Sequence, residues 1–116
     1  MEARAISRYV RQSPRKMRLV IDLIRGRSVG EAYSILQYSK KKAAKAIDKT
    51  LRSAVANSKN KAEQAGEFVD VDDLYVKEAY VNAGPVLRRW RAAALGRAEP
   101  IRRPTSHVVI VVDRKE

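Results

Sequence analysis

The chain has 116 residues, enough for one domain and too few for two separate hydrophobic cores. Hydrophobic residues make up 45% of it, which excludes a disordered basic tail, and the lack of cysteine excludes disulfides and zinc knuckles. With 25 Lys and Arg against 13 Asp and Glu, the formal net charge is +12, so a polyanionic partner is expected. Nucleic acid is favoured over an anionic membrane or an acidic protein. Neither a signal peptide nor a membrane-spanning helix is expected, which fits a cytoplasmic protein.

The chain begins with a predicted strand and a helix. In residues 2–11, side chains of different type alternate weakly along the chain, with basic residues on one side. This pattern predicts a strand. Ser13 is expected to be the N-cap of the helix, with Pro14 in its first turn and Gly26 just beyond its end. Apolar residues at helical spacing predict a buried stripe made of Met17, Val20, Ile21 and Ile24.

Two further helices are predicted. Residues 28–31 form a capping box for a short second helix, and Ser39 is expected to cap a third, which runs to about Ala62. The inner face of the third helix is apolar, comprising Ala44, Ile47, Leu51, Ala54 and Val55, and its outer face is basic, comprising Lys42, Lys45, Lys49 and Arg52. The acids that follow, Glu63 to Asp73, lack the calcium-loop spacing and are interpreted as a solvated loop.

The second half is predicted to form strands. Residues 74–81 show an apolar phase shift between Val76 and Ala79, which predicts a bulge, and residues 107–112 are a β-branched run typical of a covered strand. The expected fold is α+β, with three helices packed on a small three-stranded antiparallel sheet and a long extended β-hairpin. We expect a single domain over 1–116, with a globular body at 1–81 and 105–116 and a hairpin arm at about 82–104.

The arm is the most informative segment. Residues 82–106 contain six arginines and one acid, Glu99, and too few regularly spaced apolar residues to build a core. We predict that the flanking strands continue outward as a two-stranded ribbon with arms of about a dozen residues, reaching roughly 40 Å and turning around 92–96. An isolated ribbon is marginal in water, so it is expected to order fully only when phosphate lines it. Trp90 either stacks on an unpaired base, which is favoured, or is buried.

The candidate RNA contacts are basic residues of the first helix, the third helix and the arm, together with Trp90: Arg15, Lys16, Arg18, Lys42, Lys45, Lys49, Arg88, Arg89, Trp90, Arg91, Arg97, Arg102 and Arg103. For the helices the alternative is a solvated charged face. The three in the first helix lie near its first turn, where free N–H groups also favour anions. His107 is interpreted as structural. No catalytic residue, metal site or cofactor is recognised, so an enzyme is not expected.

Short motifs along nearly the whole chain point to one family. They include Tyr9-Val10-Arg11, Ser13-Pro14-Arg15-Lys16, Asp22-Leu23-Ile24-Arg25-Gly26, Leu74-Tyr75-Val76-Lys77, Gly84-Pro85, Arg88-Arg89, Gly96-Arg97-Ala98 and Thr105-Ser106-His107. In this order they resemble ribosomal protein number twenty-two of the bacterial large subunit. The resemblance implies a structural constituent of the large ribosomal subunit, whose body lies near the peptide exit and whose hairpin reaches through 23S-type ribosomal RNA.

The resemblance also implies that the hairpin lines the nascent-peptide exit tunnel. The tunnel tip would be Arg91, Ala92, Ala93, Ala94, Leu95, Gly96 and Arg97. Ala92 and Ala93 stand where most relatives have a Pro-Arg pair or a basic residue, so a less charged tip is expected. The implied partners are ribosomal RNA, neighbouring large-subunit proteins and the nascent peptide, with no membrane and no small-molecule substrate, although macrolide sensitivity can depend on the tip.

Two other functions fit the charge. The first two helices could form a helix-turn-helix that reads duplex DNA, although Glu31, Tyr33, Ser34 and Gln37 are a thin set of base-reading side chains. A peripheral membrane protein would need an exposed helix that is both basic and apolar on one face.

Overall fold

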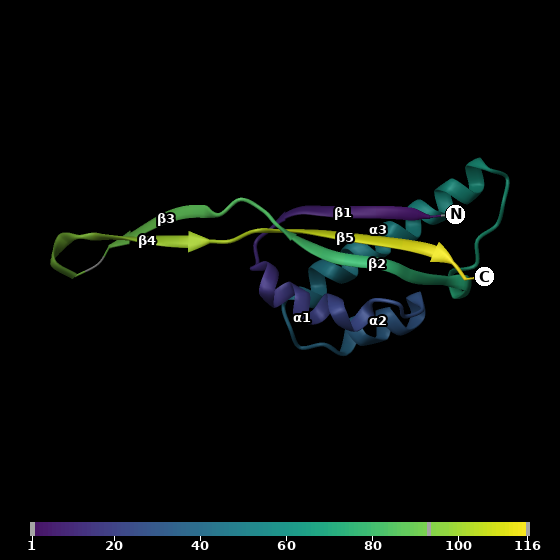
Figure 1. Cartoon of the computed structure of the whole chain (residues 1–116), viewed down its shortest axis with the longest axis horizontal. Coiled ribbons are helices and arrows are strands. Elements are labelled where there is room, and N and C mark those ends of the chain that lie inside the picture. Colours follow the sequence, from purple (N-terminus) through teal and green to yellow (C-terminus); the bar gives the residue numbers. More distant parts are fainter. Residues whose placement is uncertain (1, 93, 116) are drawn as a thin grey trace.

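Three helices cover one face of a small antiparallel sheet in the computed structural model, which describes residues 2–92 and 94–115 (Figure 1). The helices are α1 (Pro14–Ile24), α2 (Val29–Tyr38) and α3 (Ala43–Gln64). The sheet has the strand order β1 (Ala3–Val10), β5 (Ser106–Arg114) and β2 (Leu74–Ala83). The strands β3 (Leu87–Ala92) and β4 (Ala98–Arg103) form a separate two-stranded hairpin that extends away from the body. The predicted α+β class with three helices and a hairpin is confirmed.

The core lies between the helices and the sheet. The predicted stripe of α1 and the predicted inner face of α3 are buried, and they meet Val108, Ile110 and Val112 of β5. Helix α1 packs against β2, whereas α3 packs against β1 and β5. Truncation of a fully buried residue such as Ile110 to Ala would cost about 2–5 kcal/mol of stability. The body therefore forms a rigid base for the hairpin.

The helix starts follow the predicted caps with one exception. The Ser13 hydroxyl accepts a hydrogen bond from the Lys16 amide, and the Ser28 hydroxyl accepts one from the Glu31 amide. The expectation that Ser39 caps the third helix is wrong, because Ser39 ends α2 and its hydroxyl accepts from the Lys41 amide. That turn delays α3 until Ala43, with Lys42 at its N-cap position and no side-chain cap.

The predicted bulge in the second strand is confirmed. The pairing of β2 with β5 shifts register between Val76 and Glu78. A similar shift between Ser7 and Val10 in β1 accompanies the positive φ of Tyr9. Both irregularities leave the central strand β5 continuous, so the sheet stays intact up to the base of the hairpin.

The prediction that the strands of the body continue directly into the hairpin is wrong. Three residues after β2 and two before β5 lie outside any strand, and each stretch contains a proline, Pro85 or Pro104, which has no N–H for a ladder hydrogen bond. The Gly84 amide donates to the Thr105 carbonyl, and the Thr105 hydroxyl donates to the Pro85 carbonyl. The ladder of the hairpin is thus six residues per strand, about 20 Å long at ~3.3 Å per residue.

Candidate nucleic-acid interface

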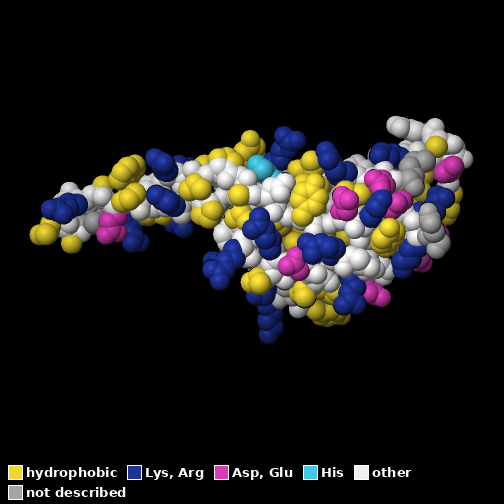
Figure 2. Space-filling model, in the orientation of Figure 1, with side chains coloured by type: hydrophobic (Ala, Val, Ile, Leu, Met, Phe, Trp, Pro, Cys, Tyr) yellow, Lys and Arg dark blue, Asp and Glu magenta, His cyan; other side chains and the backbone are white. Residues whose placement is uncertain are grey.

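The hairpin presents arginines on both faces. Residues directly opposite in an antiparallel pair point to the same face, so the pairs Arg88–Arg102 and Trp90–Pro100 share one face. The other face carries the pairs Leu87–Arg103, Arg89–Ile101 and Arg91–Glu99. Figure 2 shows the basic side chains of the hairpin, all arginines, interspersed with hydrophobic ones. With so little apolar burial, the hairpin is suited to a polyanion that surrounds it.

Two arginines directly opposite each other repel. Arg88 and Arg102 are both exposed, and neither forms an ion pair with any residue that the structure describes. On the other face, Arg91 lies 3.4 Å from the Glu99 carboxylate and is partly neutralised. Because like charges across a strand pair are destabilising, an anion between Arg88 and Arg102 would stabilise the hairpin.

Trp90 is exposed on the face that carries Arg88 and Arg102. Its side chain is 70% exposed, so the alternative that it is buried in apolar packing is wrong. An indole beside the Arg88–Arg102 pair can stack on an unpaired base while the neighbouring arginines contact phosphate. That stacking stays a prediction.

The turn of the hairpin consists of a short 3-10 segment, Ala94–Gly96, with positive φ at Leu95 and Gly96. Leu95 is 94% exposed, and the flanking Arg91, Ala92 and Arg97 are exposed too. The sequence-based turn position agrees with this arrangement, whereas Ala93, also assigned to the tip, lies outside the described residues.

On the body, the start of α3 carries an exposed basic face. Lys42, Lys45 and Lys49 are exposed and form no ion pair within the described part of the chain. Arg52, further along the same helix, already has partners within the protein. It donates to the Asp48 carboxylate at 2.9 Å and lies over the Tyr33 ring. The hydrogen bond that Arg52 donates to Asp48 raises the pKa of Arg52, and burial raises the pKa of the Tyr33 hydroxyl.

The basic residues of α1 divide into two groups. Arg15 and Lys16 are exposed in the first turn. Arg18 instead donates two hydrogen bonds to the Val81 carbonyl of β2, at 3.2 and 2.9 Å, and Arg25 does the same to the Ala79 carbonyl. Sequence patterns gave no sign of these helix-to-strand bonds. The RNA contact expected of Arg18 stays a prediction, with only part of its guanidinium available.

The structure also brings together residues that are far apart in the sequence. A cleft of about 500 Å³ lies between the start of α1, the start of α3 and the base of the hairpin. We call it the root cleft; its cations are Arg11, Lys16, Lys42, Arg89 and Arg103, and no carboxylate lines it. Four of the five were expected to bind RNA. Arg11 was missed, because only the tertiary fold shows that it faces the hairpin.

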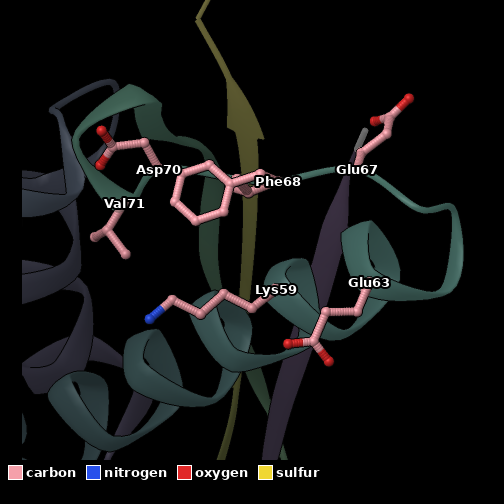
Figure 3. Close-up of a pocket in the computed structure, with 7 residues that line it drawn as sticks. Lys59, Glu63, Glu67, Phe68, Asp70 and Val71 are labelled. Carbon is pink, nitrogen blue, oxygen red and sulfur yellow. The ribbon is translucent and has the colours of Figure 1, made fainter.

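The histidine is structural, whereas the acids do not all lie in one loop, because Glu63 belongs to α3 and Asp72 and Asp73 belong to a 3-10 helix, Val71–Asp73. His107 accepts a hydrogen bond from the Tyr9 amide at 3.1 Å and contacts the Tyr9 ring edge-on, which confirms its structural role. A hollow of about 290 Å³ lies beside the acidic loop. Figure 3 shows that the carboxylates of Glu63, Glu67 and Asp70 point apart rather than toward one centre. Within the described residues no group of His, Asp and Glu could hold a metal ion.

Within 2–92 and 94–115, no helix combines the length and the apolar composition needed to cross a bilayer.

Comparisons with known proteins agree over the whole chain. A family model described as ribosomal protein L22p/L17e matches residues 5–113. The large ribosomal subunit protein uL22 of Halothermothrix orenii is 53% identical over 116 residues, covering 100% of this chain and 98% of the relative. The proteins of that name from Clostridium novyi and Bifidobacterium longum are each 51% identical, with 98% or more of both chains covered.

Proposed function

The chain belongs to the ribosomal protein L22p/L17e family of the large ribosomal subunit, and we propose that it organises large-subunit ribosomal RNA and lines the peptide exit tunnel with its hairpin. The family is a structural constituent of the ribosome and not an enzyme. The protein acts in the cytoplasm, within the large subunit. Its partners are 23S-type ribosomal RNA, neighbouring ribosomal proteins and the nascent peptide.

The observation that carries the RNA proposal is the opposed pair Arg88 and Arg102 on an exposed two-stranded hairpin. The hairpin has no second layer to pack against, and its arginines lack enough acids to neutralise them. Phosphates on both sides supply what the ribbon lacks. Most contacts are to phosphate and sugar, so the protein recognises the shape of folded RNA rather than a base sequence.

A salt series tests this function. The protein is titrated with large-subunit ribosomal RNA and with duplex DNA of equal length, and the affinity is followed against salt concentration. A variant with Arg88, Arg97 and Arg102 changed to Gln is compared with a control that changes Arg4, Lys59 and Lys115, three exposed cations of the body, to Gln. The slope of the logarithm of affinity against the logarithm of salt concentration, here called the salt slope, is expected to be smaller by about 2 in the hairpin variant. Each of the three lost single-strand phosphate contacts contributes ~0.7.

Three outcomes distinguish the alternatives. A preference for ribosomal RNA, with the larger loss in the hairpin variant, supports the proposal. A preference for duplex DNA would revive the helix-turn-helix alternative, and equal loss in both variants would mean that the hairpin has no special part in binding.

The tunnel position needs a separate test. The sequence has no cysteine, so a photo-crosslinker can be placed at Leu95→Cys on the tip and, as a control, at Glu67→Cys at the far end of the body. Large subunits reconstituted with each variant are used to translate a stalled, radiolabelled peptide. Crosslinking of the peptide to the tip alone is expected. Crosslinking to neither position would place the hairpin outside the tunnel. Substitutions at the tip would then not be expected to change macrolide sensitivity.

A further inference from the structure

The root cleft differs from the rest of the basic surface because it is concave and combines the body with the hairpin. Arg11, Lys16 and Lys42 come from the body, whereas Arg89 and Arg103 come from the hairpin. Within the part of the chain that the structure describes, none of the five forms an ion pair. Five cations around one hollow repel one another, and this repulsion favours an anion inside it.

The other lining groups indicate what kind of anion fits. Leu87 and Pro104 supply apolar surface, and both are only partly exposed. Gln12 supplies a side-chain amide that makes no hydrogen bond within the described residues, and the Ser106 hydroxyl donates to its backbone carbonyl instead. Cations, apolar surface and a free amide together match a nucleotide: phosphate on the cations, ribose or base on the apolar atoms, and a base edge on the amide.

The size of the cleft selects the form of the RNA. A hollow of about 500 Å³ has the volume of a small-ligand pocket, so it admits about one or two nucleotides and not a turn of duplex. Unpaired strands expose the base faces and edges that a paired helix conceals.

We propose that the root cleft binds one unpaired strand of RNA, which bridges the body and the hairpin. The proposal rests on the RNA-binding function and adds to it the form of the RNA and the place where it binds. Since the ladder is interrupted at Pro85 and Pro104, the bridging strand joins the hairpin to the body where backbone pairing is sparse. Binding in the cleft therefore fixes the direction in which the hairpin points.

The first test maps the RNA beside the cleft. An iron chelate that generates hydroxyl radicals is attached at Lys41→Cys, next to Lys42, and in a control at Glu67→Cys, and each protein is bound to large-subunit ribosomal RNA. Strand scission from Lys41→Cys is expected within one unpaired loop or junction, absent with the control. Scission on both strands of a continuous helix would overturn the proposal.

The second test measures the salt slope of a cleft variant, Lys42→Gln with Arg103→Gln. The control, Lys59→Gln with Lys115→Gln, removes the same charge from exposed sites that do not line the cleft. For ribosomal RNA, the salt slope of the cleft variant is expected to be smaller by about 1.4, which is twice the ~0.7 per single-strand contact. For a fully paired RNA duplex, the salt slope should change little. An equal loss on both RNAs, or a loss no larger than in the control, would overturn it.

These results are separable from the wider function. If the wild-type chain shows no preference for ribosomal RNA over duplex DNA, the proposed function fails. If that preference holds and the cleft variant behaves as its control does, only the cleft proposal fails.

Discussion

The hydroxyl of Thr105 donates a hydrogen bond of 2.6 Å to the carbonyl of Pro85, across the two chain segments that join the hairpin to the body. Thr105 is 2% exposed, so this bond is shielded from water although it lies at the base of an exposed ribbon. Together with the bond from the Gly84 amide to the Thr105 carbonyl, it holds the segments together where the ladder is interrupted.

Thr105→Val keeps the shape of the side chain and removes this donor. The partly exposed Pro85 carbonyl then loses its protein partner, which costs about 0.5–1.5 kcal/mol. We expect faster hydrogen exchange at the Gly84 amide, because the base of the hairpin opens more often than the core does. Ser34→Ala, which removes an exposed hydroxyl bond within α2, is the control and should change nothing at Gly84. Unchanged exchange in Thr105→Val would contradict the role assigned to the hydroxyl.

Gly84→Ala tests the close packing at the same place. A Cβ at Gly84 would lie 2.5 Å from the Thr105 hydroxyl oxygen and 3.2 Å from the His107 ring. We expect the free energy of unfolding in urea to fall by about 1–3 kcal/mol, as overpacking does. Gly30→Ala is the matched control, because a Cβ there meets nothing within 4 Å and Ala favours the helix by up to ~1 kcal/mol. Equal stability of the two variants would show that the residues around Gly84 move to accommodate a Cβ without a cost in stability.

Arg18 and Lys16 lie in the same helix and are expected to have different main roles. Arg18→Met removes both hydrogen bonds to the Val81 carbonyl, so the free energy of unfolding in urea should fall by about 1 kcal/mol. Because only part of its guanidinium is available to phosphate, the salt slope should fall less than in Lys16→Met. Lys16→Met should leave the midpoint unchanged and lower the slope by about 0.7. If Arg18→Met instead flattens the slope as much as Lys16→Met does, its guanidinium contacts phosphate as well as β2.

Trp90 offers a direct optical measurement, because it is the only tryptophan. Its 70% exposure predicts that Trp90→Ala changes stability by less than about 0.5 kcal/mol. Loss of a stacked base should weaken binding to ribosomal RNA by about 1–3 kcal/mol. Quenching of the wild-type indole emission on RNA binding checks the same contact. A Leu95→Ala control removes another exposed apolar side chain of the hairpin, one without a ring to stack.

Local patterns were sufficient for most elements of the fold. The stripe from Met17 to Ile24 and the β-branched run of β5 were predictable because helical spacing and alternation are set within a few residues. The bulge after Val76 was visible as a change of apolar phase. Ser39 misled because the same hydroxyl can cap a helix or bind the amide two residues ahead, and only the fold decides between them.

Tertiary relationships in the site were less accessible. The sequence shows that Arg88 and Arg102 are basic, but only the register places them directly opposite each other. Composition likewise cannot show that Arg18 reaches the Val81 carbonyl, or that Arg11 and Lys42 face the base of the hairpin. These contacts depend on how elements distant in the chain pack, which no short window contains.

The strand order β1–β5–β2 has a consequence for the time at which the protein folds. Strand β5 follows β1 and β2 in the sequence but lies between them in the sheet, and within the described residues neither β1 nor β2 pairs with any other strand. A growing chain that stops before Ser106 can form helices, yet it has no central strand and cannot complete the sheet. The body must therefore close after β5 has been synthesised, in a step that depends on contacts between strands far apart in the sequence and is accordingly slow. Until then the edges of β1 and β2 stay unpaired, so truncated products should aggregate or be degraded rather than accumulate as a folded half.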